Sequence, residues 1–223
     1  VHMYQDNKKN KSKKYPLCSL DDQELEPFMN ENIIHVFDMS PIQKIMLNEG
    51  KKDTLHKNYI IQTMFDIQGN LDMNVFKQAF SQVINMHQSI KSSFQEINQM
   101  PVQFIHKNVE LPIIELDWSN KKDVEINLTQ LLKKDRDKGF DTENAPLFRM
   151  HFILLNQKEK LYKILLTHHQ VILDGWSFRI LLKNLYKNIH LITKKIESTN
   201  THTSQFDQFI SWNINQDKEK ALS

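Results

Sequence analysis

Two consecutive histidines followed by an Asp-Gly pair are the residues of this chain best suited to chemistry. His168 and His169 end an apolar run, and Asp174-Gly175 follows after four further residues. Histidine is the usual proton-transfer group near neutral pH, and an imidazole at the end of a strand can meet a substrate in a cleft. The Asp174 carboxylate can bond neighbouring backbone amides in a tight turn or pair with a buried base. Taken alone, such a pattern is more often structural than catalytic.

Hydrophobic periodicity predicts the elements that must position these residues. Apolar runs and alternations indicate strands over 58–68, 89–97, 101–107, 112–117, 147–155 and 161–167. Apolar stripes at helical spacing indicate helices from Ser40-Pro41 and over 72–86, 121–137, 177–192 and 204–215. Since strands and helices alternate, the sequence predicts an α/β fold with a mixed sheet.

Bulk composition limits the classes of function. The 223 residues are 39% hydrophobic and 25% charged, as in ordinary globular proteins. A net charge of +2 from 29 basic and 27 acidic side chains is too even for a protein that neutralises phosphates, so no nucleic-acid partner is expected. Apolar runs of transmembrane length and a signal sequence are absent, and no membrane partner is expected. The single cysteine, Cys18, excludes an internal disulfide and indicates the reducing cytoplasm.

The histidine pair does not predict a metal site. His168 and His169 are adjacent, so they point to opposite faces of a strand and cannot bind one ion together. The sequence holds no further cluster of ligands at suitable spacing. We therefore expect no bound metal.

Residues 169–175 read His-Gln-Val-Ile-Leu-Asp-Gly and are followed by Trp176-Ser177. This segment resembles the HHxxxDG signature of condensation domains from nonribosomal peptide synthetases, whose usual continuation is Trp-Ser. Further stretches resemble patterns of that family in the expected order, at 38–47, 86–94, 139–149 and 206–212. Because these matches run in order across most of the chain, it is identified as a member of this family.

The resemblance implies a fold and a reaction. The fold is the chloramphenicol-acetyltransferase-like two-layer sandwich, a mixed sheet flanked by helices, and this chain would be the single N-terminal lobe of a two-lobed domain. The motif lies at the floor of a tunnel between the lobes. Aminoacyl thioesters on the phosphopantetheine arms of carrier proteins enter from opposite faces, and the acceptor amine attacks the donor thioester. The implied partners are peptidyl and aminoacyl carrier domains and the C-terminal lobe, and no cofactor is expected to bind directly.

The same resemblance implies which residues form the site. Catalytic positions fall on His169, Gln170, Asp174 and Gly175, and supporting positions fall on His168, Lys91, Trp176 and Ser177. Gln170 stands where the family keeps its second histidine, which handles the attacking amine. A glutamine donates and accepts hydrogen bonds but cannot take a proton near neutral pH. The alternative register, His168 with His169, would need a bulge and would point the wrong group at the substrate.

Two further expectations concern the stretch at 86–94. Lys91 replaces the second arginine of the family pattern RHxxLRT, which helps hold the motif aspartate, so the resemblance implies a contact between Lys91 and Asp174. A lysine lacks the planar, two-pronged donor group with which an arginine binds a carboxylate. His87 is expected to order the structure rather than react.

We expect three segments: a disordered leader or tag over 1–19, a linker with a short helix over 20–36, and the lobe over 37–223. Val1-His2-Met3 reads as an expression-vector remnant. Two functions remain open. In the first, the parent is an acyltransferase that forms peptide bonds, and this half is inactive alone. In the second, the chain is a degenerate, non-catalytic domain that docks carriers or recruits tailoring enzymes. Epimerisation, ester formation and starter acylation also remain open as subtypes.

Overall fold

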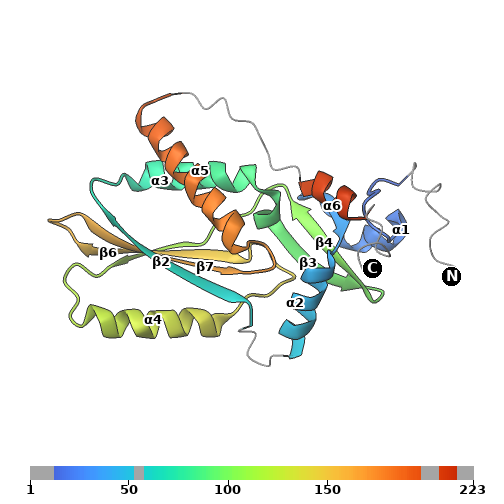
Figure 1. The fold of residues 1–223 in the computed structure, drawn as a ribbon, viewed down its shortest axis with the longest axis horizontal. Helices are drawn as coiled ribbons and strands as arrows, with labels where there is room; N and C mark the ends of the chain where they lie inside the picture. Colours follow the sequence, from blue (N-terminus) through green and yellow to red (C-terminus); the bar gives the residue numbers. More distant parts are fainter. Residues whose placement is uncertain (1–12, 53–57, 197–205, 215–223) are drawn as a thin grey trace, which may run out of the picture.

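The computed structural model describes residues 13–52, 58–196 and 206–214, in which helices are interspersed among the strands (Figure 1). The strands are β1 Ile33–Asp38, β2 Ile60–Gln68, β3 Ser92–Ile97, β4 Met100–His106, β5 Ile113–Asp117, β6 Phe148–Asn156 and β7 Leu161–His169. The α-helices are α1 Asp22–Leu25, α2 Pro41–Lys52, α3 Met73–Met86, α4 Val124–Lys138, α5 Gly175–Thr193 and α6 Phe206–Ile214. Two short 3-10 helices are η2 Glu26–Phe28 and η3 Gln88–Lys91.

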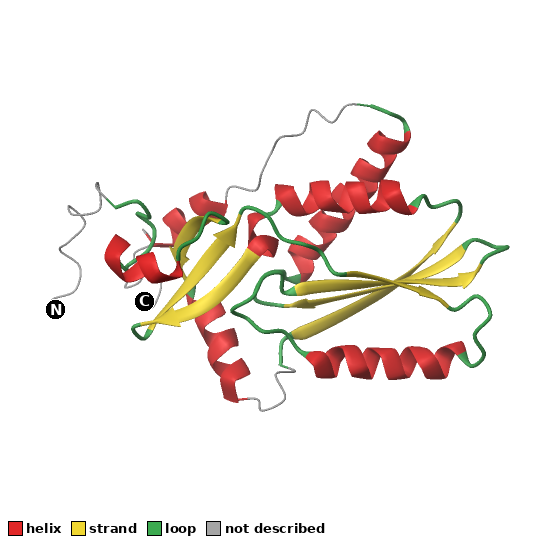
Figure 2. Ribbon diagram, turned by 180° about the vertical axis from the view of Figure 1, so that it is seen from behind, coloured by secondary structure: helices red, strands yellow, loops and turns green. Residues whose placement is uncertain are grey.

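The strands form two sheets. The larger has the order β2-β7-β6-β5, in which β7 is antiparallel to both of its neighbours and β5 is parallel to β6. The smaller is antiparallel, with the order β1-β4-β3. Helices α3 and α5 cover one face of the larger sheet and α4 covers the other (Figures 1 and 2). The predicted α/β class, with a mixed sheet flanked by helices, is confirmed.

A few boundaries differ from the sequence prediction. The strand expected over 89–97 begins at Ser92, because residues 88–91 wind into the 3-10 helix η3. The helix expected from Lys121 begins at Val124. Strand β1 has no counterpart among the predicted strands, and its strand character comes from pairing with β4, a contact between distant segments.

The main hydrophobic core fills the space between the larger sheet and helices α3 and α5. Helix α3 buries its predicted apolar stripe there, with Phe76, Ala79, Phe80, Val83 and Ile84 below the surface. Strands β6 and β7 supply Phe148, Met150, Phe152, Ile164 and Leu166, and α5 supplies Leu181 and Leu185. Because β7 and α5 share this core, the turn that joins them is packed between two fixed elements.

Residues 13–19, the end of the predicted leader, pack against the smaller sheet. Tyr15 and Cys18 are buried there among the side chains of β1, β3 and β4. Burial raises the pKa of the Cys18 thiol to about 12, which leaves it unreactive. Residues 1–12 lie outside the described part of the chain, and the division of the chain at 19 and 36 stays a prediction.

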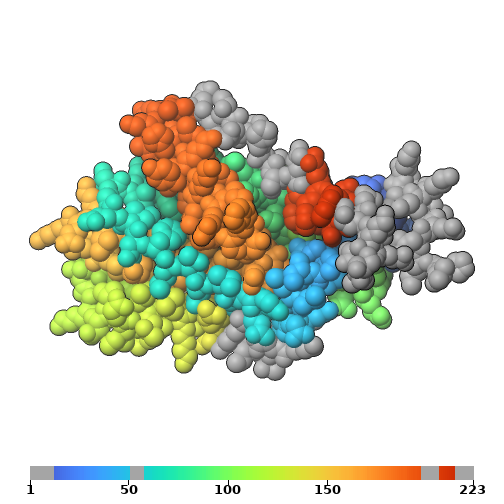
Figure 3. Space-filling model, viewed as in Figure 1, coloured from blue at the N-terminus to red at the C-terminus, as the bar shows by residue number. Residues whose placement is uncertain are grey.

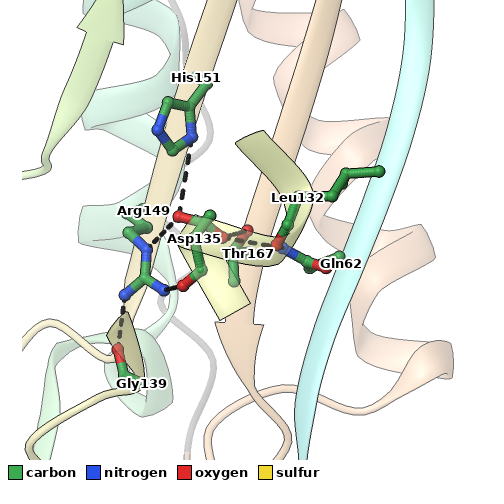
Figure 4. A network of polar contacts seen from close by, with 7 residues as sticks. All are labelled: Gln62, Leu132, Asp135, Gly139, Arg149, His151 and Thr167. Carbon is green, nitrogen blue, oxygen red and sulfur yellow. Dashed lines mark hydrogen bonds and ion pairs between the residues drawn. The ribbon is translucent and has the colours of Figure 1, made fainter. Parts of the chain in front are cut away.

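A buried ionic network anchors α4 to the face of the larger sheet opposite the main core (Figure 4). The Asp135 carboxylate on α4 accepts hydrogen bonds from Nε of Arg149 on β6 and, at 2.6 Å, from Oγ1 of Thr167 on β7. Nε2 of Gln62 on β2 donates to the same carboxylate at 3.0 Å. Arg149 also donates to the backbone oxygens of Asp135 and Gly139. One carboxylate therefore joins α4 to three neighbouring strands.

This network keeps Asp135 ionised in spite of its burial. Burial alone raises the pKa of Asp135, but the hydrogen bonds and the charge of Arg149, with the bonds from Thr167 and Gln62, outweigh it and hold the pKa below its usual value. The Arg149 guanidinium also lies 4.2 Å from the centroid of the Phe140 ring. A buried charge whose partner is removed has nothing to replace the lost water, so the loss of either member is costly.

Replacing Arg149 with methionine should lower the free energy of unfolding by roughly 3–5 kcal/mol, because Asp135 is then buried without a counter-ion. Removing both charges, in Asp135→Leu with Arg149→Met, should recover part of that loss. Urea denaturation followed by circular dichroism measures both.

The matched control is Lys77→Met, which breaks an ion pair with Glu115 whose side chains are 44% and 51% exposed. That change should cost less than about 1 kcal/mol, because exposed pairs contribute little. A loss for Arg149→Met no larger than that of the control would contradict the anchoring role.

Candidate functional site

The end of β7 sends its last two residues to opposite faces of the larger sheet. Pairing with β2 sets His169 opposite Ile60, and pairing with β6 sets His168 opposite Phe148. Side chains alternate along a strand, so His168 points to the face covered by α5, whereas His169 shares the α4 face with Thr167. The sequence prediction of opposite faces is confirmed by the contacts of the two rings.

His168 supports the turn between β7 and α5. Its Nε2 lies 3.1 Å from the carbonyl oxygen of Leu173, and its ring is stacked on Phe178 of α5 with the centroids 5.9 Å apart. Burial lowers the pKa of His168 to about 4, although the bond to the Leu173 carbonyl opposes the shift. At neutral pH the ring is therefore uncharged and donates from Nε2. This histidine holds the turn together.

His169 presents a neutral ring to a cavity. The backbone N–H of Val171 donates to Nδ1 at 3.1 Å, so the ring proton of the neutral form is on Nε2. The ring centroid lies 6.2 Å from that of Tyr59. Burial, and secondarily the nearby His168, lowers the pKa of His169 to about 4. The ring can donate a hydrogen bond but has no free basic nitrogen.

The cavity that His169 lines has a volume of about 470 Å³, and we call it the His169 cavity. Its walls come from α2, β3 and residues 138–143, with Met39, Leu47, Phe94, Pro101 and Phe140 as its apolar members. The backbone N–H of Phe94 donates to the carbonyl oxygen of Thr142 at 2.7 Å and ties two of these walls together. Because the buried network holds the Gly139 carbonyl and the Phe140 ring, it also fixes this wall.

Gln170 lies on a second cavity of about 580 Å³, which we call the Gln170 cavity. Its backbone N–H donates to the carbonyl oxygen of Tyr59 at 2.8 Å, which fixes the first residue of the turn to the start of β2. The cavity is walled by the first turns of α2 and α5, by the turn 170–174 and by α6, and its polar members include Ser40, Gln43, His87, Ser89, Asp174 and Ser177. The two positions of the motif thus open onto different cavities.

Asp174 begins helix α5. Its carboxylate accepts the backbone N–H of Ser177 at 2.7 Å, as an N-cap does, and the hydrogen bonds of Ser177 hold the pKa of Asp174 below its usual value. Gly175 is the first helical residue, and a Cβ there would meet open space. Trp176 is 73% exposed. Asp174 and Ser177 reach the Gln170 cavity, whereas Trp176 points to the surface.

The expected contact between Lys91 and Asp174 is not formed. The Lys91 ammonium, on a buried side chain, donates to the carbonyl oxygen of Lys107 at 3.3 Å, while Asp174 bonds its own helix. Burial lowers the pKa of Lys91. The lysine ammonium is a compact charge that lacks the planar fork of an arginine, and its bond to the Lys107 carbonyl fastens η3 to the end of β4.

Sequence reasoning missed two contributions to the Gln170 cavity. His87, at the end of α3, and Phe206 and Phe209 of α6 line it, although they are far from the motif along the chain. Their family-like stretches were the only signal in the sequence. The buried network of Asp135 had no signal at all.

Two kinds of feature are absent from the described ranges. Residues 13–52, 58–196 and 206–214 contain no group of three or more histidine, cysteine or acidic side chains that could hold a metal ion. In the same ranges no helix is long and apolar enough to cross a membrane.

Comparison with known proteins gives a consistent result. The family model for the condensation domain matches residues 33–223. A linear gramicidin synthase protein of Brevibacillus parabrevis is 30% identical over 212 residues, which are 93% of this chain and 4% of that protein. Bacitracin synthase 3 of Bacillus licheniformis is 27% identical over 195 residues, which are 87% of this chain and 3% of that protein. The chain therefore spans only a few per cent of these relatives.

Solved structures share the fold. The starter condensation domain of rhizomide synthetase has a TM-score of 0.70 at 16% identity, over 80% of this chain and 45% of that chain. The epimerization domain from the third module of tyrocidine synthetase B has a TM-score of 0.68 at 18% identity, over 82% of this chain and 41% of that chain. Because the family model matches residues 33–223, most of this chain, the chain belongs to the condensation-domain family of nonribosomal peptide synthetases.

Proposed function

We propose that this chain is the N-terminal lobe of a condensation domain whose parent synthetase forms amide bonds between carrier-bound aminoacyl or peptidyl thioesters. The observation that carries the proposal is the end of β7, which sets His169 and Gln170 on two cavities with Asp174 at the turn between strand and helix. The span of the chain, 45% of a solved starter condensation domain, fits one lobe of two.

The chemistry asks little of the protein. A thioester is already activated, so holding it beside an amine supplies much of the acceleration. Gln170 can orient an amine by hydrogen bonding, but it cannot accept the proton that the amine loses. His169 does not substitute, because it lines the other cavity and its Nδ1 is occupied by Val171. Because positioning alone supplies much of the acceleration, a parent that carries Gln170 should retain activity even without a proton acceptor at that position.

The proposed partners follow from the surface around the Gln170 cavity. Ile42 of α2, Ile180 of α5 and Phe209 of α6 line it while 57%, 44% and 48% exposed. The surfaces of these three helices lie on one face of the molecule (Figure 3). Apolar side chains gathered at an open cavity favour a covering protein surface, and we assign that role to the C-terminal lobe. Carrier domains would deliver the phosphopantetheine-bound thioesters, without a directly bound cofactor, in the cytoplasm.

One observation favours the second candidate function, a non-catalytic domain that docks carriers or recruits tailoring enzymes. Gln170 removes the titratable group from the motif position that handles the amine. Such a domain would keep the fold and the exposed apolar rim while making no product.

Replacing Gln170 with alanine in the complete synthetase should lower the rate of amide formation about tenfold, because one hydrogen bond to the amine is lost. The rate is measured by mass spectrometry with aminoacyl-loaded donor and acceptor carriers. Gln208→Ala, at an exposed position of α6, is the control and should leave the rate unchanged. Absence of amide product from the unaltered synthetase would favour the docking function instead.

The chain alone should form no dipeptide from the same loaded carriers, since it lacks the wall that we assign to the second lobe. Circular dichroism checks that the isolated chain is folded, and the complete synthetase is the positive comparison. Dipeptide made by the folded chain alone, at a rate near that of the complete synthetase, would refute the requirement for a second lobe.

A further inference from the structure

An imidazole from outside the motif lines the Gln170 cavity. His87 lies where α3 ends and η3 begins, and its backbone N–H donates to the carbonyl oxygen of Ile84. Its half-buried side chain shares the cavity with Gln170, Asp174 and Ser89. The end of a helix packed on α5 is a rigid position, so the ring is held at this wall.

The other ionisable groups nearby are poorly suited to take a proton there. His168 faces the main core, and His169 lines the other cavity. Among the described residues that line the Gln170 cavity, Asp174 is the only other ionisable one, and its lowered pKa makes it a weak base. Lys91 is turned away, onto the carbonyl of Lys107.

Asn184 of α5 steadies the ring in either protonation state. The Asn184 amide nitrogen lies 3.1 Å from Nε2 of His87. Once that amide turns over and presents its oxygen, the neutral ring carries its proton on Nε2 and donates it to Asn184, so that Nδ1 is the unprotonated nitrogen and accepts the new proton. Burial lowers the pKa of His87, so at neutral pH the ring is uncharged and able to accept a proton.

We propose that His87 accepts the proton of the attacking amine in the Gln170 cavity, while Gln170 only orients the amine. This inference rests on the proposed function and identifies the group that handles the proton. The amine nitrogen forms the new C–N bond as the C–S bond of the thioester breaks. The proton passes from nitrogen to His87 and from there to the leaving thiolate, so the step needs no further reactant.

The test is the rate of amide formation by the complete synthetase, with and without His87→Gln. The variant should lower the rate about 10²- to 10⁴-fold, the usual contribution of a general base, with little change in KM for the carriers. His106→Gln is the matched control. His106 is also half-buried, and burial also lowers its pKa. Its ring is hydrogen-bonded to Ser93, and it lines neither cavity. It should change the rate less than about twofold.

The dependence of kcat/KM on pH separates proton transfer from a structural role, because a structural role would not change its slope. The amine itself contributes a slope of one below about pH 7.7. Because His87 must be unprotonated, kcat/KM should steepen to a slope of about two at pH values below the usual histidine pKa of about 6.5. In His87→Gln the slope should stay at one. In case glutamine disturbs the end of α3, His87→Gly with added imidazole gives a second test, and the imidazole should restore the rate.

Each result has one meaning. A His87→Gln enzyme with the unaltered rate and pH profile would overturn the role of His87 and leave the proposed function standing. A rise of more than about a hundredfold in Gln170→His would also overturn it, because the proton would then have lacked an acceptor. No amide from the unaltered synthetase would overturn the proposed function itself, and this inference with it.

Discussion

Strand β7 is paired along both edges, and that double pairing decides which way each of its last residues points. β2 and β6 fix the register so that His168 and His169 cannot exchange faces without breaking two ladders at once. A slip of one residue would turn His169 into the main core and His168 towards α4. The separation of the two cavities is therefore a property of the sheet. The position of Gln170 is fixed because its backbone N–H donates to the carbonyl oxygen of Tyr59, the residue before β2.

The buried carboxylate of Asp135 extends this constraint to the cavity wall. Thr167, two residues before His169 on the same face, donates to it, and Arg149 links it to the Gly139 carbonyl. The strand end and the loop that faces it across the His169 cavity thus share one anchor. Replacing such a network with apolar side chains often costs nothing in stability. Its directed hydrogen bonds, which apolar groups lack, are what orient the loop relative to the strand.

Local pattern was sufficient for the parts of the fold that depend on local sequence. The stripe of α3 and the apolar runs of β6 and β7 were predictable because burial on one face repeats at a fixed spacing. The opposite facing of His168 and His169 follows from the same argument. Contacts between distant segments were not predictable: Lys91 meets Lys107 instead of Asp174, and the position of His87 on the cavity depends on how α3 packs against α5. No spacing rule relates residues that only tertiary packing brings together.

Whether the site is catalytic or degenerate depends on the chemical groups that surround Gln170. Nδ1 of His168 is buried without a hydrogen-bond partner in the described part of the chain, which costs roughly 1–3 kcal/mol. An apolar ring at that position would keep the stacking on Phe178 but would leave the Leu173 carbonyl without this donor. The retained histidine shapes the turn through Leu173, and the turn sets Gln170 and Asp174 on a cavity that also contains an imidazole. Gln170 has no acid–base capacity of its own, whereas His87 brings an imidazole to the same cavity.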